Sequence, residues 1–159
     1  MVGRPAGRPI CISGRPRLDY RGGVSMRYVV LVSHGMFAEG LHDAVCMLGG
    51  VRGESTFLAT GLKEGMSVDA FANSFRELIS AAGPEDEIIL FGDIIGGSPL
   101  STATSVIVDG GFKDRTIVIG GMNLPLVLMA VLSKDLMSLA ELEAALIPDA
   151  REAIHKLKI

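Results

Sequence analysis

Short aliphatic runs alternate with stretches of helical periodicity from Arg27 onward. Such runs are typical of strands that are buried on both faces, as in a parallel sheet. Four strands are predicted, at Arg27–Ser33, Thr56–Thr60, Glu87–Phe91 and Thr116–Ile119. Strands that alternate with helices form right-handed βαβ units. We therefore expect a single α/β domain over residues 26–159, with an open, doubly wound, mostly parallel sheet and helices on both faces.

The first two predicted helices are placed by the spacing of their apolar residues and by residues that start or stop helices. The inner face of the first carries Leu41, Ala44, Val45 and Leu48. Gly49 and Gly50 end that helix, because glycine readily adopts the left-handed conformation of a helix end. Ser67 caps the second helix, whose inner face carries Phe71, Phe75, Leu78 and Ile79. Gly83-Pro84 stops it.

The later helices follow from similar signals. Ser98 is expected to be the N-cap of the third helix, with Pro99 at its first helical position, where the missing N–H costs nothing. The fourth helix runs from 124 to about 132. The tail is expected to form two helical stretches, 138–147 and 149–158, because Pro148 interrupts the pattern.

Three of the four strands end in polar loops that contain glycine. These loops are Ser33-His34-Gly35, the segment from Asp93 to Ser98, and Gly120-Gly121-Met122-Asn123. A parallel sheet brings the ends of its strands to one edge, where α/β proteins bind ligands and place reactive groups. The candidate site is therefore at this edge.

His34 and Asp93 end two long buried strands and form the candidate reactive pair. A carboxylate that accepts the Nδ1–H of a histidine fixes the tautomer and leaves Nε2 as a nucleophile. The same carboxylate stabilises the imidazolium charge that develops when Nε2 attacks. This reasoning predicts nucleophilic chemistry at His34, oriented by Asp93.

Gly96-Gly97-Ser98-Pro99 has the features of a loop that binds an anion. Two glycines allow close approach of the backbone, and a helix start presents free N–H groups. Helix-end electrostatics supply only about 0.3–1 kcal/mol. Several N–H bonds and the hydroxyls of Ser33 and Ser98 would therefore be needed to hold a phosphoryl group. The alternative is an ordinary loop and helix cap.

The charge of the chain is unevenly distributed. The net charge is −3, although residues 1–25 carry five arginines and one aspartate. The acidic remainder argues against nucleic acid as the main partner. Residues 1–25 repeat Gly-Arg-Pro, which favours a disordered leader, either non-native sequence or translation from a start upstream of Met26. The alternative is a basic tail that binds RNA or anionic lipid.

Several chemistries and compartments are disfavoured by the sequence. Cys11 and Cys46 lack metal spacing and are expected to be free thiols, and no cluster of His, Cys and carboxylates predicts a metal. There is no membrane-length apolar run and no secretory signal, so a cytoplasmic protein is expected. His42 and His155 are expected to be surface residues.

Familiar catalytic fingerprints are also missing. GxxxxGK[ST] and GxGxxG do not occur, which makes a nucleotide-binding domain an unfavourable interpretation. A Ser–His–Asp hydrolase could use Ser98, but the chain has no GxSxG nucleophile elbow. No cofactor is predicted.

The three loop motifs together resemble the IIA component of the mannose-family (mannose/fructose/sorbose) phosphotransferase system, or PTS. The resemblance rests on Ser33-His34-Gly35, Asp93 to Pro99, and Gly121-Met122-Asn123-Leu124-Pro125, and it extends from about Met26 to the C-terminus. It implies a phosphocarrier whose histidine takes a phosphoryl group from phospho-HPr and passes it to a IIB component. The IIB component then phosphorylates a sugar that enters through the membrane components IIC and IID.

The resemblance also assigns roles to individual residues. His34 would be phosphorylated on Nε2, and Asp93 would be the partner of Nδ1. The phosphoryl group would be held by a set of neighbouring residues, namely Ser33, Gly35, Gly96, Gly97 and Ser98. Asn123 and Pro125 would shape the adjacent loop. The resemblance further implies a homodimer that needs no metal. Because no IIB domain follows in the sequence up to Ile159, the IIB partner is expected to be a separate protein.

Two alternatives of related chemistry remain open. One is the phosphocarrier subunit of a PEP-dependent dihydroxyacetone kinase, which shares the fold and an early histidine. The Gly-Gly-Ser-Pro and Asn-Leu-Pro stretches favour the mannose family instead. The other is a regulatory module in which phosphorylation of His34 signals carbon or nitrogen status without sugar transport.

Overall fold

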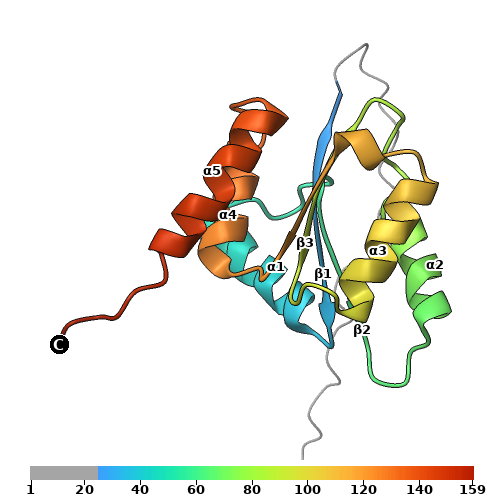
Figure 1. The fold of residues 1–159 in the computed structure, drawn as a ribbon, viewed down its shortest axis with the longest axis horizontal. Coiled ribbons are helices and arrows are strands. Elements are labelled where there is room, and N and C mark those ends of the chain that lie inside the picture. Colours follow the sequence, from blue (N-terminus) through green and yellow to red (C-terminus); the bar gives the residue numbers. More distant parts are fainter. Residues whose placement is uncertain (1–24) are drawn as a thin grey trace, which may run out of the picture.

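The computed structural model describes residues 25–159, in which one sheet lies between two layers of helices (Figure 1). The strands are β1 (Arg27–His34), β2 (Phe57–Leu62), β3 (Glu87–Gly92) and β4 (Thr116–Gly120). Their order in the sheet is β2-β1-β3-β4, and each neighbouring pair is parallel. The predicted open α/β fold is confirmed. Nearly all of the predicted leader, including Cys11, lies outside the described residues.

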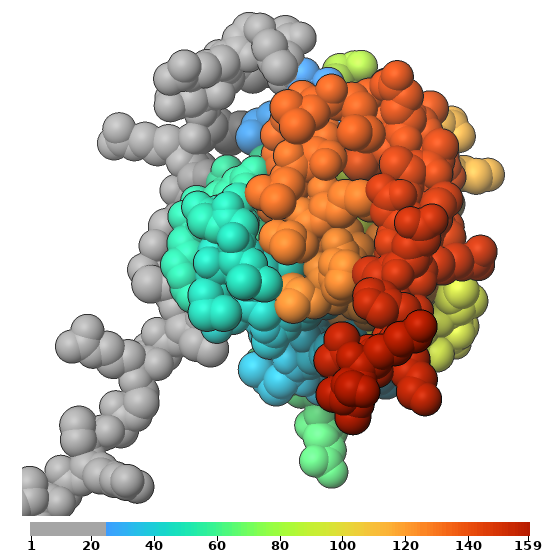
Figure 2. Space-filling model, turned by 90° about the vertical axis from the view of Figure 1, so that its left-hand side faces the viewer, coloured from blue at the N-terminus to red at the C-terminus, as the bar shows by residue number. Residues whose placement is uncertain are grey.

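The helices cover both faces of the sheet, as predicted. They are α1 (Phe37–Gly49), α2 (Val68–Leu78), α3 (Ser98–Asp109), α4 (Leu124–Ser133) and α5 (Leu139–Glu152), with a short 3-10 helix η1 (Lys113–Arg115). Helices α2 and α3 lie on one face, and α1, α4 and α5 lie on the other (Figure 1). Helix α4 lies between α1 and α5 (Figure 2). This position explains its almost entirely apolar sequence, because α4 has neighbours on several sides.

The central strands β1 and β3 are buried on both faces because side chains alternate across a sheet. The odd-numbered residues Val29, Leu31, Ile89 and Phe91 face α1, α4 and α5. The even-numbered residues Val30, Val32, Ile88 and Leu90 face α2 and α3. All eight side chains are fully buried. Two cores therefore hold these strands in place, which gives their ends a fixed position.

Strand β2 and helix α1 differ in detail from the prediction. Strand β2 continues to Leu62, which pairs with His34, so Gly61 and Leu62 are sheet residues and not loop residues. The buried face of α1 consists of Ala38, Leu41, Val45 and Cys46, whereas Leu48 is exposed. The predicted face was partly wrong because two adjacent apolar stripes share Leu41 and Val45. Contact with β1 and β2 selects one of them.

The start of α3 also corrects the prediction. Gly97, and not Ser98, is the N-cap, with extended backbone angles (φ −69°, ψ 151°). The carbonyl of Gly97 accepts the N–H of Ser101, which is the first bond of the helix. Ser98 is therefore the first helical residue, and its hydroxyl does not cap the helix.

Helix α5 is one continuous helix that contains Pro148, so the predicted break was wrong. Proline removes one helical hydrogen bond and usually kinks or ends a helix. Here Leu142, Leu146 and Ala150 are buried on one face that spans the proline. This burial offsets the lost bond. The helix ends at Glu152, short of the predicted Lys158.

Candidate functional site

Three parallel strands end close together at the edge where α1 and α3 begin, which is the lower edge in Figure 1. Val32 of β1 is in register with Gly92 of β3, and Gly92 is in register with Gly120 of β4. His34 is the last residue of β1, and Asp93 directly follows β3. The register of the sheet therefore brings together two residues that are 59 positions apart in sequence.

His34 and Asp93 are joined by two hydrogen bonds. The imidazole Nδ1 lies 2.9 Å from Asp93 Oδ2, and the backbone N–H of His34 donates to the same oxygen at 2.8 Å. The second carboxylate oxygen, Oδ1, accepts the N–H of Ile94 at 2.8 Å. The Asp93 side chain is 13% exposed, whereas that of His34 is 48% exposed. A buried, oriented carboxylate thus holds a ring that reaches solvent.

The environment of Asp93 keeps its carboxyl group ionised. Burial raises its pKa, but the hydrogen bonds from the backbone and ring of His34 and from the Ile94 N–H outweigh this effect, so the pKa of Asp93 lies below its usual value. When Nδ1 carries the proton, the Nδ1–H group donates a hydrogen bond to the carboxylate, and Nε2 carries the free lone pair. The pair can therefore present Nε2 as a nucleophilic nitrogen.

The lowered pKa of Asp93 predicts a specific dependence of stability on pH. Its folded-state pKa is below the unfolded value of 3.8, so the ionised carboxylate stabilises the fold above about pH 4. This contribution is lost as the pH falls through the folded-state pKa. As the pH falls below about 4, the free energy of unfolding measured with urea should decrease more steeply for wild type than for Asp93→Asn. Parallel profiles would contradict this assignment.

The loop from Ile94 to Gly97 lies directly against the imidazole. A Cβ atom on Gly97 would be 2.8 Å from Cε1 of His34. The Gly97 N–H bonds to the Ile94 carbonyl at 3.2 Å, so this amide, predicted to hold a phosphoryl group, is already engaged in a turn. Gly96 has φ +79°, which favours glycine. The two glycines thus have different tasks: Gly96 makes the turn, and Gly97 leaves space for the histidine.

Replacing Gly97 by alanine is expected to slow the predicted phosphorylation of His34 by about 10- to 100-fold. A displacement of a reacting group by about 1 Å can lower a reaction rate by that factor. The backbone angles of Gly97 suit alanine, so the effect arises from the contact with the ring. The measurement is the rate of phosphorylation, and urea unfolding shows whether the variant keeps its stability. Gly83→Ala is the matched control, because its Cβ would meet its nearest atom at an ordinary 3.5 Å. Equal rates for the two variants would refute the prediction.

Ser33 and Gly35, both predicted to hold the phosphoryl group, lie at the end of β1 and in the turn that follows it. Ser33 is fully buried, and its Oγ accepts the N–H of Ala38 at 2.7 Å. The Gly35 N–H bonds to the carbonyl of Leu62 at 2.9 Å, and Gly35 has φ +57°. These bonds stabilise the turn between β1 and α1. The Ser33 Oγ and the Gly35 N–H are therefore engaged in bonds that position the residues on either side of His34.

The other predicted residues lie at two helix starts. Ser98 is exposed in the first turn of α3, next to Gly97. Asn123 is the N-cap of α4, and its Oδ1 accepts the N–H of Leu126 at 3.1 Å. Pro125 belongs to the first turn of that helix. Ser98 is thus next to the loop from Ile94 to Gly97 that contacts His34, while Asn123 and Pro125 form the start of α4.

Sequence reasoning missed two glycines that support the site. A Cβ on Gly61 would lie 1.8 Å from the carbonyl oxygen of Gly35. A Cβ on Gly120 would lie 2.2 Å from Cγ1 of Ile95. Both glycines therefore allow the ends of β2 and β4 to contact the loops beside His34 and Asp93. In the sequence alone, a glycine after a strand indicates only a turn.

His42 is not a free surface residue, so that prediction was wrong. Its ring stacks on Phe57 with centroids 4.3 Å apart, and Nε2 lies 3.1 Å from the Phe57 carbonyl oxygen. The Sγ of Cys46, a buried free thiol, is 3.7 Å from Nδ1. His42 links α1 to β2 and is not part of the site. His155 is exposed, as predicted.

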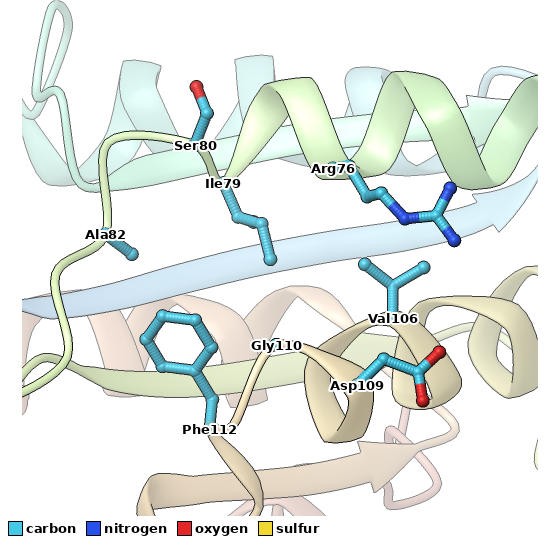
Figure 3. Close-up of a pocket in the computed structure, with 8 residues that line it drawn as sticks. All are labelled: Arg76, Ile79, Ser80, Ala82, Val106, Asp109, Gly110 and Phe112. Atoms are coloured by element: carbon cyan, nitrogen blue, oxygen red, sulfur yellow. The ribbon is translucent and has the colours of Figure 1, made fainter.

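One cavity is separate from this site. It has a volume of about 350 Å³ and lies between the C-terminal ends of α2 and α3 (Figure 3). Ile79, Val106 and Phe112 give it apolar walls, with Arg76 and Asp109 at one end. Because α2 and α3 run opposite to the strands, this cavity is at the edge where the strands begin. It therefore contributes nothing to the chemistry of His34.

No helix within residues 25–159 combines the length and the apolar character needed to cross a membrane. Within the same range, no group of three or more His, Cys, Asp or Glu residues is arranged to hold a metal ion.

Comparisons with known proteins agree on one family. Residues 28–147 match the model of the EIIA-man family, described as the PTS system fructose IIA component. The PTS system fructose-specific EIIA component of Bacillus subtilis (strain 168) is 25% identical over 114 residues, which is 72% of this chain and 75% of that relative.

Two of the solved structures with a similar fold are named as IIA proteins of the PTS. The PTS IIA protein associated with the fucose utilization operon of Streptococcus pneumoniae has 25% identity and a TM-score of 0.70, and the match covers 83% of this chain and 93% of that one. The mannose/sorbose-specific IIA subunit of Enterococcus faecalis shares the fold, with 20% identity, a TM-score of 0.71, and coverage of 84% and 96%. Because the family model spans most of the chain and includes both His34 and Asp93, this protein belongs to the EIIA-man family of PTS IIA components.

Proposed function

We propose that this protein is a PTS phosphocarrier that receives a phosphoryl group on Nε2 of His34 from phospho-HPr. It then passes the group to a IIB component, which is coupled to sugar uptake through IIC and IID. The geometry of His34 and Asp93 carries this proposal, since it gives a IIA-family chain an oriented, solvent-reaching imidazole. The fructose-specific relative supports sugar phosphotransfer over the dihydroxyacetone kinase alternative. The homodimer implied by the resemblance belongs to the same proposal.

In the proposed reaction, Nε2 of His34 attacks the phosphorus in line with the donor nitrogen. The P–N bond to the donor histidine breaks as the P–N bond to His34 forms, and the electron pair returns to the donor ring. Positive charge develops on the His34 imidazole, and the Asp93 carboxylate stabilises that charge through Nδ1–H. Catalysis of this kind depends on positioning and electrostatics.

We assign the contacts of the phosphoryl group to the start of α3. Ser98 is exposed beside the turn that contacts the imidazole, and its hydroxyl takes no part in capping. The N–H groups of Gly96 and Ser98 are next to the engaged N–H of Gly97 and are not used by the bond that closes the turn. The N-terminus of a helix favours an anion. Ser33, Gly35 and Gly97 then act by shaping the site.

The test is phosphorylation of the purified protein with PEP, enzyme I and HPr. We expect an acid-labile phosphate on this chain that requires HPr and that is lost again when IIB is added. A wild-type protein that gains no such phosphate would refute the phosphocarrier function. A stable phosphate that IIB does not remove would refute the onward transfer and favour the regulatory alternative.

A further inference from the structure

The cavity between the C-terminal ends of α2 and α3 combines apolar walls with two opposite charges at one end (Figure 3). Ile79 and Val106 are buried, and the ring of Phe112 forms a third apolar wall. Arg76 and Asp109 are exposed and lie together at one end of the cavity. The volume of about 350 Å³ is typical of a site for a small molecule. The cavity therefore suits a ligand that is apolar at one end and charged at the other.

The Phe112 wall is held in place by hydrogen bonds at the end of α3. The Phe112 N–H donates to the carbonyl of Ile107 at 3.1 Å, and the Gly111 N–H donates at 3.1 Å to the carbonyl of Val108. These two bonds form a Schellman motif, which requires the positive φ that Gly111 has, +81°. The Phe112 carbonyl also accepts the hydroxyl of Thr116 at 2.8 Å. The backbone on both sides of the aromatic ring is thus fixed, so the cavity is built into the fold.

Arg76 and Asp109 come from different helices. Arg76 is in the last turn of α2, where its Nη1 donates to Oδ1 of Asn73 at 2.8 Å. A guanidinium has several N–H donors, so this bond orients the side chain and leaves donors for a ligand. Asp109 is the last residue of α3. Among residues 25–159, no ion pair involves Arg76 or Asp109. The cavity thus has a positive and a negative group that do not neutralise each other.

The charges at this end of the cavity select a ligand that carries both signs. The C-termini of α2 and α3 add partial negative charge, which favours an ammonium group beside Asp109. The guanidinium of Arg76 is the group that matches a carboxylate. A ligand with only a carboxylate would be repelled by Asp109, and one with only an ammonium group would be repelled by Arg76. A zwitterion satisfies both side chains.

We propose that this cavity binds a free α-amino acid that has an apolar side chain. Its carboxylate accepts hydrogen bonds from Arg76, its ammonium group donates to Asp109, and its side chain lies against the apolar walls. An α-amino acid carries its two charges on one carbon, in keeping with the position of Arg76 and Asp109 at the same end. The cavity is at the opposite edge of the sheet from His34, so this inference does not depend on the proposed phosphoryl transfer.

Isothermal titration calorimetry of the purified protein tests the proposal, with L-phenylalanine and L-leucine as probes. We expect saturable binding of both at a single site. Phenethylamine lacks the carboxylate of phenylalanine, and 3-phenylpropionate lacks its ammonium group. Each should bind about 10-fold more weakly than L-phenylalanine or worse, because each loses a hydrogen bond between charged groups.

Two variants connect the binding to the two charged side chains. Arg76→Gln and Asp109→Asn should each weaken the binding of L-phenylalanine by about 10-fold. Arg76→Gln should not weaken the binding of phenethylamine, which has no carboxylate, and Asp109→Asn should not weaken that of 3-phenylpropionate, which has no ammonium group. A general loss of structure would instead weaken the binding of every probe.

Arg151→Gln and Asp149→Asn are the matched controls. Both residues are exposed on α5, which covers the other face of the sheet, and Arg151 is in the last turn of its helix, as Arg76 is. These variants should bind L-phenylalanine as wild type does. Urea unfolding checks that all four variants retain the fold.

Three results would overturn the proposal. The first is that wild type binds neither amino acid saturably. The second is that Arg76→Gln or Asp109→Asn binds L-phenylalanine with the affinity of wild type. The third is that phenethylamine or 3-phenylpropionate binds as tightly as L-phenylalanine, since the cavity would then take a ligand with a single charge. Phosphorylation of His34 is measured separately, so a failure of either proposal leaves the other intact.

Discussion

Replacing His34 by alanine is expected to reduce phosphorylation of the protein to background. The variant lacks Nε2, the nucleophile that takes the phosphoryl group in the proposed reaction. The fold should persist, because the side chain is half exposed and the backbone N–H of residue 34 still donates to Asp93. We expect the free energy of unfolding to change by about 1 kcal/mol, the net value of one hydrogen bond. Acid-labile phosphate and urea unfolding are the two measurements.

His155→Ala is the control for this prediction. It removes an exposed histidine from the end of the chain, outside the site, and should leave phosphorylation unchanged. If His34→Ala is labelled as well as His155→Ala, the phosphoryl group resides elsewhere and His34 is not the acceptor.

The second large effect is expected for Asp93→Asn, which keeps the shape of the side chain and removes its charge. An amide can turn its NH₂ group toward Nδ1 and so favour the tautomer with the proton on Nε2, which has no lone pair there. The stabilisation of the developing imidazolium is lost as well. We expect transfer from phospho-HPr to slow by about 10²- to 10⁴-fold, the range found for proton-transfer and tautomer-fixing groups. Single-turnover labelling measures this rate.

The fold of Asp93→Asn should remain intact, with a modest loss of stability at neutral pH. In wild type, the N–H groups of His34 and Ile94 donate to the two oxygens of a charged carboxylate. Such charge-assisted hydrogen bonds are stronger than those between neutral groups. Asp114→Asn is the control, because Asp114 is an exposed carboxylate in η1, before β4 and at the other edge of the sheet. Transfer by Asp93→Asn at the wild-type rate would remove Asp93 from the mechanism.

The arrangement also separates the tasks of neighbouring residues in the same short loops. His34 and Asp93 carry the proposed chemistry, and Gly61, Gly97 and Gly120 leave the space that their backbones need.

The sequence by itself determined the strands and the edge at which the reactive residues meet. Two aliphatic runs, in 27–33 and 87–91, predict strands that are buried on both faces, since a run without alternation requires such burial, and β1 and β3 confirm this. Parallel strands share one edge, so His34 and Asp93 had to lie near each other once the βαβ pattern was established. Local chemistry was equally readable at Ser67, whose Oγ caps α2 as predicted.

Tertiary structure decided what depends on contacts between distant residues. Ser33 was predicted to bind the phosphoryl group, but its Oγ accepts the N–H of Ala38 in the first turn of α1, a contact that depends on how α1 follows β1. Pro148 stays inside α5 because Leu142, Leu146 and Ala150 are buried across it. The role of Gly97 depends on how closely its loop approaches His34. Periodicity and propensity describe one element at a time, whereas burial, register and close approach belong to pairs of elements that the sequence keeps far apart.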